Sequence, residues 1–276
     1  MSSLPNWLLI GAPRAGTTWL ARNLRAHPQV FLPDREVHFF DRHLGSGLDW
    51  YRRQFNPTLA QTSVGDATPS YLHCDRRTPE LLSQWVPEAR LVAILRDPID
   101  RARSEYYNSL SKRRAVASTF EAEFRSNEWM RRAGRYAASL RNYWQYFARD
   151  RMLILRYEDL AGNPGALFEA VVRFLEIDPC FKPPLLDFRV NSVAPKLRMY
   201  HSRILYLAQQ AATKLGRHRV AGAIQSLNNK PLPGIAEETR KRLFEEHYAA
   251  DVAALESELG WDLSGWRCPG QVTGER

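Results

Sequence analysis

The chain has 276 residues, of which 44% are hydrophobic and 25% are charged. This length suits one large domain or at most two small ones, and the composition is that of an ordinary soluble globular protein. The formal net charge of +9 indicates an anionic partner. Because the basic residues are spread along the chain without interleaved aromatic platforms, nucleic acid is not the expected partner.

Cysteine usage and the apolar segments point to a cytoplasmic location. The three cysteines, at 74, 180 and 268, are odd in number and scattered, which favours neither a disulfide framework nor a metal cluster. No basic residue precedes the short apolar run at residues 7–10, as a secretory signal would require. No stretch approaches the roughly 18 apolar residues of a membrane span, so no transmembrane segment is expected.

Strands and helices are predicted to alternate along the chain. Strands are predicted at residues 6–12, within 63–71, at 91–95 and at 151–157, and helices at 17–28, 99–110, 136–150, 165–177 and 243–259. Residues 179–197 contain several prolines and are predicted to form a long loop. The alternation and the apolar strands predict an α/β fold around a mainly parallel sheet, with one domain as the simplest arrangement.

Residues 11–20, GAPRAGTTWL, have the spacing of a phosphate-binding loop that lacks its lysine. Gly11, Gly16 and Thr18 match the pattern G-x-x-x-x-G-K-[ST], whereas Thr17 occupies the lysine position and Arg14 lies inside the loop. Such a loop directs backbone N–H groups and a helix N-terminus toward an anion. Arg14 can form two parallel hydrogen bonds with one terminal phosphate or sulfonate. An ordinary strand-to-helix turn with a solvent-facing Arg14 is the alternative.

A second pair of residues suits a second phosphate. Arg96 follows the strand at 91–95, and Ser104 comes two turns into the next helix. Ligands of open α/β sheets bind at the carboxyl ends of strands, so this pair is predicted to lie near the loop. Asp97 and Pro98 are interpreted as a helix N-cap and first helical residue, in preference to a magnesium-binding aspartate. A surface ion pair of Arg96 and an idle Ser104 are the alternative.

Together, GAPRAGTTWL and RDPIDRARSEYY resemble the sulfotransferases that use 3′-phosphoadenosine 5′-phosphosulfate (PAPS). The segments GRYAASLRNYW and LESELGWDLSGW resemble the same family, in the same order. The resemblance implies the sulfotransferase fold, a P-loop NTPase-like three-layer α/β fold with a mainly parallel sheet of about five strands, as a single domain over residues 1–276. It also implies a nucleotide site in two parts: Arg14, Ala15, Gly16, Thr17 and Thr18 on the 5′-phosphosulfate, and Arg96 with Ser104 on the 3′-phosphate.

The segment FLPDREVHFFD, residues 31–41, resembles the KE-x-HFFD segment of glycosaminoglycan-type sulfotransferases, whose glutamate is the catalytic base. The resemblance makes Glu36 the base and His38 its neighbour and rival, while Arg35 replaces the flanking lysine. Many members carry lysine where Arg14 stands, in contact with the leaving-group oxygen. Arginine can neutralise charge in that catalytic position but cannot donate a proton.

Two further segments bear on the acceptor and the nucleotide. GDATPSYL resembles the family stretch E-K-x-P-x-Y, in which Asp66 keeps an acid but Ala67 replaces a lysine. That replacement weakens the case for a highly sulfated polysaccharide acceptor. Lys196 and Arg198 lie where the family closes over the nucleotide, and they are expected to reach its phosphates. Two exposed charges on a loop are the alternative.

The predicted function is therefore a PAPS-dependent sulfotransferase that needs no metal and acts on an acceptor hydroxyl by in-line transfer. The segment around Glu36 favours a carbohydrate, although sugar, lipid, natural-product and tyrosine hydroxyls all remain open. A P-loop kinase that uses ATP and magnesium and a non-catalytic nucleotide-binding module are the alternative functions. Nothing in the residues predicts the oligomeric state.

Overall fold

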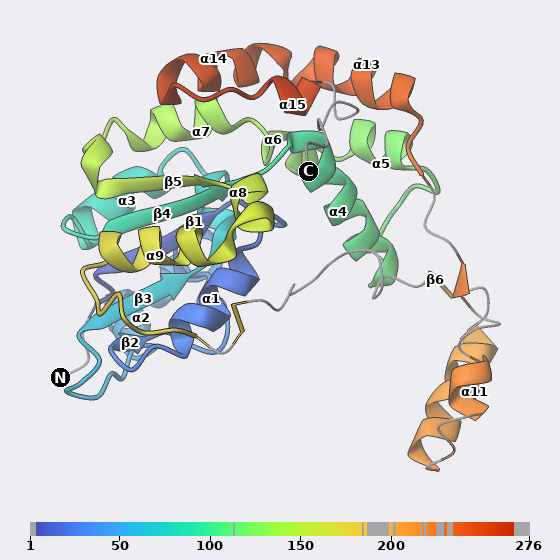
Figure 1. The fold of residues 1–276 in the computed structure, drawn as a ribbon, viewed down its shortest axis with the longest axis horizontal. Coiled ribbons are helices and arrows are strands. Elements are labelled where there is room, and N and C mark those ends of the chain that lie inside the picture. The colour runs from blue at the N-terminus through green and yellow to red at the C-terminus, as the bar shows by residue number, and fades with distance from the viewer. Residues whose placement is uncertain are drawn as a thin grey trace.

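A five-stranded parallel sheet forms the centre of the protein in its computed structural model (Figure 1). The strands are β1 (Trp7–Gly11), β2 (Val30–Phe31), β3 (Ser63–Ala67), β4 (Arg90–Leu95) and β5 (Met152–Arg156). Their order in the sheet is β2-β3-β1-β4-β5, and every neighbouring pair is parallel. The predicted α/β class and the mainly parallel sheet are confirmed. The structure describes residues 4–112, 114–183, 185–186, 199–200, 203–215, 217, 220–224, 229–230 and 234–267.

Helices surround this sheet and build a further layer above it. The longer ones are α1 (Thr17–Arg25), α3 (Thr78–Trp85), α4 (Pro98–Ser111), α7 (Tyr136–Tyr143), α9 (Pro164–Phe174), α11 (Arg203–Lys214), α13 (Glu237–His247) and α14 (Ala249–Leu259). The short ones are α2 (Leu48–Arg52), α5 (Phe120–Ser126), α6 (Glu128–Arg132), α8 (Tyr157–Gly162), α15 (Ser264–Arg267), η1 (Phe39–His43), η2 (Leu44–Ser46), η3 (Pro69–Leu72) and η4 (Arg149–Arg151). In Figure 1, α1 and α9 lie in front of the sheet, α3 lies behind it, and α14 runs over α7.

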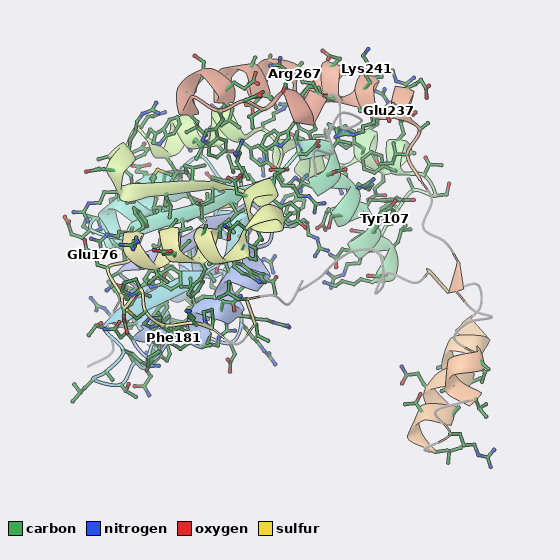
Figure 2. All side chains as sticks on the ribbon, viewed as in Figure 1. Tyr107, Glu176, Phe181, Glu237, Lys241 and Arg267 are labelled. Atoms are coloured by element: carbon green, nitrogen blue, oxygen red, sulfur yellow. The ribbon has the colours of Figure 1, made fainter. Side chains whose placement is uncertain are left out.

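The C-terminal helices close the upper edge of the molecule. Figure 2 labels Glu237 and Lys241 on α13 and Arg267 on α15, and all three lie along this upper edge. Below them, α13 contacts α4, the helix that follows β4. Away from the sheet, α11 contacts β6 (Met199–Tyr200), which pairs antiparallel with β7 (Asn229–Lys230) (Figure 1).

Apolar strands form the core, as their sequences predict. The side chains of β1 and those of β4 from Leu91 to Leu95 are almost completely buried, because helices cover both faces of the sheet. The predicted strands at 6–12, 63–71, 91–95 and 151–157 correspond to β1, β3, β4 and β5. No helix among the residues described here is long and apolar enough to span a membrane.

Two predicted helices differ most from the structure. The predicted helix at 136–150 ends at Tyr143, and a 3-10 turn precedes β5. The single helix predicted at 243–259 is wrong, because it breaks at Tyr248 into α13 and α14. Tyr248 leaves the helical conformation with φ −129°, and its buried ring packs so close to Gly134 that a Cβ there would lie 2.9 Å from it. Apolar spacing alone predicts a continuous helix because it carries no information about that neighbour.

Candidate active site

The loop between β1 and α1 has the conformation of an anion cradle. Gly16 has φ 91°, in the left-handed region, and a Cβ there would lie 2.6 Å from the Leu160 side chain, so both conformation and space require glycine. The backbone N–H groups of Thr17 and Thr18 have no protein acceptor among the described residues. The first turn of α1 contains no acidic residue, so its positive dipole end is uncompensated.

One hollow joins this loop to the second predicted phosphate pair. It has an empty volume of about 390 Å³ and is lined by Arg14, Gly16, Thr17, Thr18, Trp19, Arg96, Ser104 and Tyr157. Six of these eight residues belong to the site predicted from the sequence. Ala15 is buried within the loop and does not line the hollow. Lys196 and Arg198 lie outside the described residues.

Direct contacts hold the two halves of this hollow together. Arg14 donates from Nε to Ser104 Oγ at 3.2 Å, and Arg96 donates to the Arg14 carbonyl oxygen at 3.1 Å. The Arg96 guanidinium also lies over the Tyr157 ring, 4.3 Å from its centroid. Tyr136 donates to the Arg96 carbonyl oxygen at 2.8 Å, which fixes the backbone at the end of β4. The structure thus brings the loop and the carboxyl end of β4 into one site.

The electrostatics of the hollow favour a bound anion. Burial lowers the pKa of the Arg14 guanidinium; Glu105, whose carboxylate lies 3.9 Å from Arg14 Nε, opposes this effect, while Arg96 and Arg101 add to it. Both contacts of Arg14 use Nε, so its terminal nitrogens have no acceptor within the described part of the chain. Two partly desolvated cations that face one space repel each other, and an anion between them relieves that repulsion.

Asp97 caps a helix, as its sequence predicts. Its Oδ1 accepts hydrogen bonds from the backbone N–H groups of Ile99 at 2.9 Å and Asp100 at 3.0 Å. Its Oδ2 pairs with Arg240 of α13. Burial raises the Asp97 pKa to about 6, and Arg240 opposes that rise. Because both oxygens have protein partners, Asp97 serves the helix and the packing of α13 rather than the hollow.

The segment after β2 carries a chain of acidic and imidazole groups. Glu36 Oε2 lies 3.0 Å from His38 Nε2, and His38 Nδ1 lies 3.0 Å from Asp41 Oδ2. Ser70 donates to the same Asp41 oxygen at 2.6 Å. The Glu36 side chain is 51% exposed, whereas those of His38 and Asp41 are 16% and 8% exposed. Glu36 is therefore the most exposed member of this chain.

A second hollow brings Glu36 to the phosphate loop. Its empty volume is about 560 Å³, and its lining includes Glu36 together with Thr17 and Thr18. Because these two threonines also line the first hollow, the two spaces meet at the start of α1. The second hollow is lined by three arginines, Arg22, Arg25 and Arg35, and by two carboxylates, Asp34 and Glu36. Arg25 donates to the carbonyl oxygens of residues 32 and 33, while Arg22 and Arg35 are exposed without a partner among the described residues.

A buried network anchors the segment that contains Glu36 and His38. Asp66 is fully buried and accepts hydrogen bonds from Thr68 at 2.7 Å, Tyr51 at 2.9 Å and Tyr71 at 3.2 Å. Thr68 Oγ1 in turn accepts the backbone N–H groups of residues 37 and 38, and the Tyr71 hydroxyl accepts those of residues 39 and 40. Burial raises the Asp66 pKa to about 6, although its three hydroxyl donors and His38 lower it. Asp66 thus anchors the backbone of residues 37–40 through the hydroxyl groups of Thr68 and Tyr71.

Sequence reasoning missed several members of the site. The sequence predicts Tyr157 only as the end of a strand. Asp41 and Ser70 lie in the segments FLPDREVHFFD and GDATPSYL, but no role is predicted for either residue. The spacing of His38 and Asp41 hints at their contact, since residues three apart share a face of a helical turn. No local signal predicts that Arg96 lies over Tyr157, because the two residues are 61 positions apart in the sequence. Arg96 follows β4, whereas Tyr157 follows β5.

Comparison with known protein families gives a match over a range that includes the residues of this site. The profile of a family described as "Sulfotransferase domain" matches residues 4–205. Among curated proteins, mouse heparan sulfate glucosamine 3-O-sulfotransferase 3B1 is 34% identical over 180 residues, which are 62% of this chain and 46% of that protein. Human heparan sulfate glucosamine 3-O-sulfotransferase 6 is 33% identical over 178 residues, 62% of this chain and 52% of that protein. The chain thus spans about half the length of the curated relatives that it matches.

A solved structure shares the fold over nearly the whole chain. The crystal structure of a sulfotransferase from Alicyclobacillus acidocaldarius matches with a TM-score of 0.71 and 23% sequence identity, over 96% of this chain and 99% of that one. At this identity the match shows the fold alone. It confirms the predicted three-layer P-loop NTPase-like architecture.

Proposed function

The chain belongs to the sulfotransferase family, and from this premise we propose that it moves the sulfonyl group of PAPS to a hydroxyl group of a carbohydrate acceptor. One observation carries the proposal: Thr17 and Thr18 line both the hollow of Arg96 and Ser104 and the hollow of Glu36. A donor in the first hollow and an acceptor in the second would meet at these threonines. Group transfer requires that kind of proximity.

The first hollow suits the nucleotide because it offers two separate groups of donors. The 5′-phosphosulfate would bind at the start of α1, with the N–H groups and hydroxyls of Thr17 and Thr18 as its donors. The 3′-phosphate would bind Arg96 and Ser104 at the carboxyl end of β4. Arg14 belongs to the loop before α1 and contacts Ser104, and its terminal nitrogens can stabilise the charge that develops on the leaving phosphate.

Glu36 is the proposed base because of its exposure and its partner. Each ring nitrogen of His38 faces a carboxylate, so an imidazolium satisfies both contacts and a neutral ring only one. His38 would have to leave Glu36 before Nε2 could take a proton from an acceptor. In the proposed step, Glu36 removes the hydroxyl proton, the acceptor oxygen attacks sulfur, and the bond from sulfur to the 5′-phosphate oxygen breaks.

A carbohydrate acceptor is supported by the second hollow and by the relatives. Curated relatives that match the chain are named as heparan sulfate glucosamine 3-O-sulfotransferases. The exposed Arg22 and Arg35 would suit an acceptor that carries an acidic group near the reacting hydroxyl.

Nucleotide binding tests the proposed function most directly. Calorimetric titrations of adenosine 3′,5′-bisphosphate, ADP and ATP, each with and without magnesium, should yield tight binding of the bisphosphate alone, independent of magnesium. The reason is that the site offers a 3′-phosphate pair and no lysine for a β/γ-phosphate chain. A preference for ATP with magnesium would instead favour a kinase.

Arg96→Ala should weaken binding of the bisphosphate by about 1.5–3 kcal/mol, the usual contribution of a hydrogen bond to a charged group. Binding of 5′-AMP, which lacks the 3′-phosphate, should change much less. Arg90→Ala is the matched control, because Arg90 begins the same strand at its opposite end, where it pairs with Glu176. Calorimetry of both nucleotides measures the difference, and an equal loss for 5′-AMP would contradict the assignment of Arg96.

A further inference from the structure

A third and larger hollow lies apart from the nucleotide and acceptor sites. One wall consists of the turn after η3 and the start of α3, and the other wall consists of α6 and α7. The empty volume of this hollow is about 1390 Å³. We call it the arginine groove, since it is lined by Arg76, Arg77, Arg132, Arg135 and Arg141. The acidic residues in its lining are Asp75 and Glu80, so positive charge dominates.

Three of these arginines are not used by the protein itself. Arg132 donates to the Cys74 carbonyl oxygen at 2.9 Å, and Arg141 pairs with Glu258. The side chains of Arg76, Arg77 and Arg135 are exposed and have no hydrogen-bond or ion-pair partner within the described ranges. Guanidinium groups gathered around one space without protein partners present forked donors to carboxylate, sulfate or phosphate groups.

The inner wall of the groove contains an unpartnered histidine. His73 is only 6% exposed, and neither of its ring nitrogens has a hydrogen-bond partner in the described part of the chain. Burial lowers its pKa to about 3, with Arg101 and Arg132 adding to the effect. His73 therefore stays neutral and offers one donor and one acceptor, but no charge. A buried polar ring without a partner is costly in a folded protein, so His73 is a strained member of this wall.

The rest of the lining favours a sugar over a nucleic acid. The side-chain amides of Asn142 and Gln145 donate to backbone carbonyl oxygens, which leaves their own oxygens available to hydroxyl groups. Tyr146, which also lines the groove, is 41% exposed. Single-stranded nucleic acid is usually held by a series of aromatic platforms, and this groove has one such ring.

We propose that the arginine groove is a binding site for an acidic oligosaccharide, a sugar strand that carries carboxylate or sulfate groups, separate from the site of the reacting hydroxyl. The short helix η3 places it beside the acceptor hollow, because Pro69 at one end lines that hollow and Leu72 at the other lines the groove. Insofar as the bound strand is part of the acceptor, the inference rests on the proposed carbohydrate acceptor. Binding in the groove itself requires no transfer.

A pair of triple variants tests this site. The groove variant combines Arg76→Ala, Arg77→Ala and Arg135→Ala, whose side chains make no hydrogen bond or ion pair among the described residues. The matched control combines Arg53→Ala, Arg114→Ala and Arg217→Ala, which removes the same charge from exposed positions elsewhere. Calorimetry at physiological salt would use a heparin octasaccharide, a single-stranded DNA octamer and adenosine 3′,5′-bisphosphate, without any sulfonyl donor.

The groove variant should lose about tenfold or more of its octasaccharide affinity, equivalent to about 1.4 kcal/mol. The control should retain nearly all of it, and bisphosphate binding should be unchanged in both. Equal losses of octasaccharide affinity in the two variants would mean that net charge alone attracts the sugar, and this result would overturn the proposal. Unchanged affinity in both variants would overturn it as well. Tight DNA binding that the groove variant also loses would overturn the sugar assignment. Absent bisphosphate binding would contradict the proposed function but leave the groove result intact.

Discussion

Glu36→Gln should lower kcat for sulfonyl transfer by about 10²–10⁴-fold, the usual contribution of a general base. Glutamine has nearly the same size and keeps the cleft filled, but its amide cannot take a proton from the acceptor. Affinity for adenosine 3′,5′-bisphosphate should be unchanged, because Glu36 does not line the hollow of Arg96 and Ser104. Steady-state transfer at saturating donor and calorimetry of the bisphosphate together separate the two effects.

The control is Asp34→Asn, which neutralises another exposed carboxylate two residues away, 3.5 Å from Arg25. It should leave kcat nearly unchanged. His38→Asn should cost less than Glu36→Gln, because in the proposed step His38 orients the base and does not receive the proton. Wild-type kcat in the Glu36 variant, with a large loss in the His38 variant, would exchange the two assignments.

Asp66→Asn should reduce kcat by about 10²-fold at pH 8, a loss typical of misplacing a reacting group by about 1 Å. The Asp66 carboxylate accepts three hydroxyl donors, and two of those hydroxyls hold the backbone of residues 37–40. An asparagine at this position has one acceptor oxygen and adds a donor, so the network cannot keep its geometry. Because the Asp66 pKa is about 6, the wild-type group is ionised at pH 8 and protonated at pH 5. The ratio of wild-type to variant kcat should therefore shrink toward pH 5.

Two tyrosines offer a matched test of this anchoring. Tyr51→Phe and Tyr71→Phe each remove one hydroxyl donor to Asp66, but only the Tyr71 hydroxyl also accepts the backbone N–H of Phe39, at 2.7 Å. Tyr71→Phe should therefore lower kcat well below that of Tyr51→Phe, even where urea unfolding finds similar stabilities. Equal kcat losses would mean that Asp66 stabilises the core without positioning the base.

The same carboxyl affects stability with a sign opposite to that of most acids. Its pKa in the folded protein, about 6, lies above the ordinary aspartate value of 3.8, so protonation favours the folded state. Its contribution to the free energy of unfolding falls as the pH rises from about 4 to about 6. Asparagine does not titrate, so the stability of wild type relative to the Asp66→Asn variant should decline across this window. Urea unfolding of both proteins at several pH values measures that decline.

Local patterns in the sequence determined most of the architecture. The apolar runs in β1 and β4 and the glycines of the first loop predict a parallel sheet with a loop and a helix at its carboxyl edge. The Asp97–Pro98 step predicts the start of α4, because a cap and its helix are neighbours in the chain. Motifs of this kind are local, so the residues themselves contain the information. They also predict the loop, Arg96, Ser104 and Glu36 as members of the candidate site.

Only the tertiary structure decided how these parts meet. The contact of Arg14 with Ser104 joins residues 90 positions apart. The hydrogen bond from the Phe39 backbone N–H to the Tyr71 hydroxyl joins the segment after β2 to the segment after β3. The break at Tyr248 and the arginine groove depend on which helix packs against which, and periodicity does not specify a partner. A sequence pattern reports the preference of a segment for burial or for a turn. Distances between segments arise from packing, which balances all of those preferences at once.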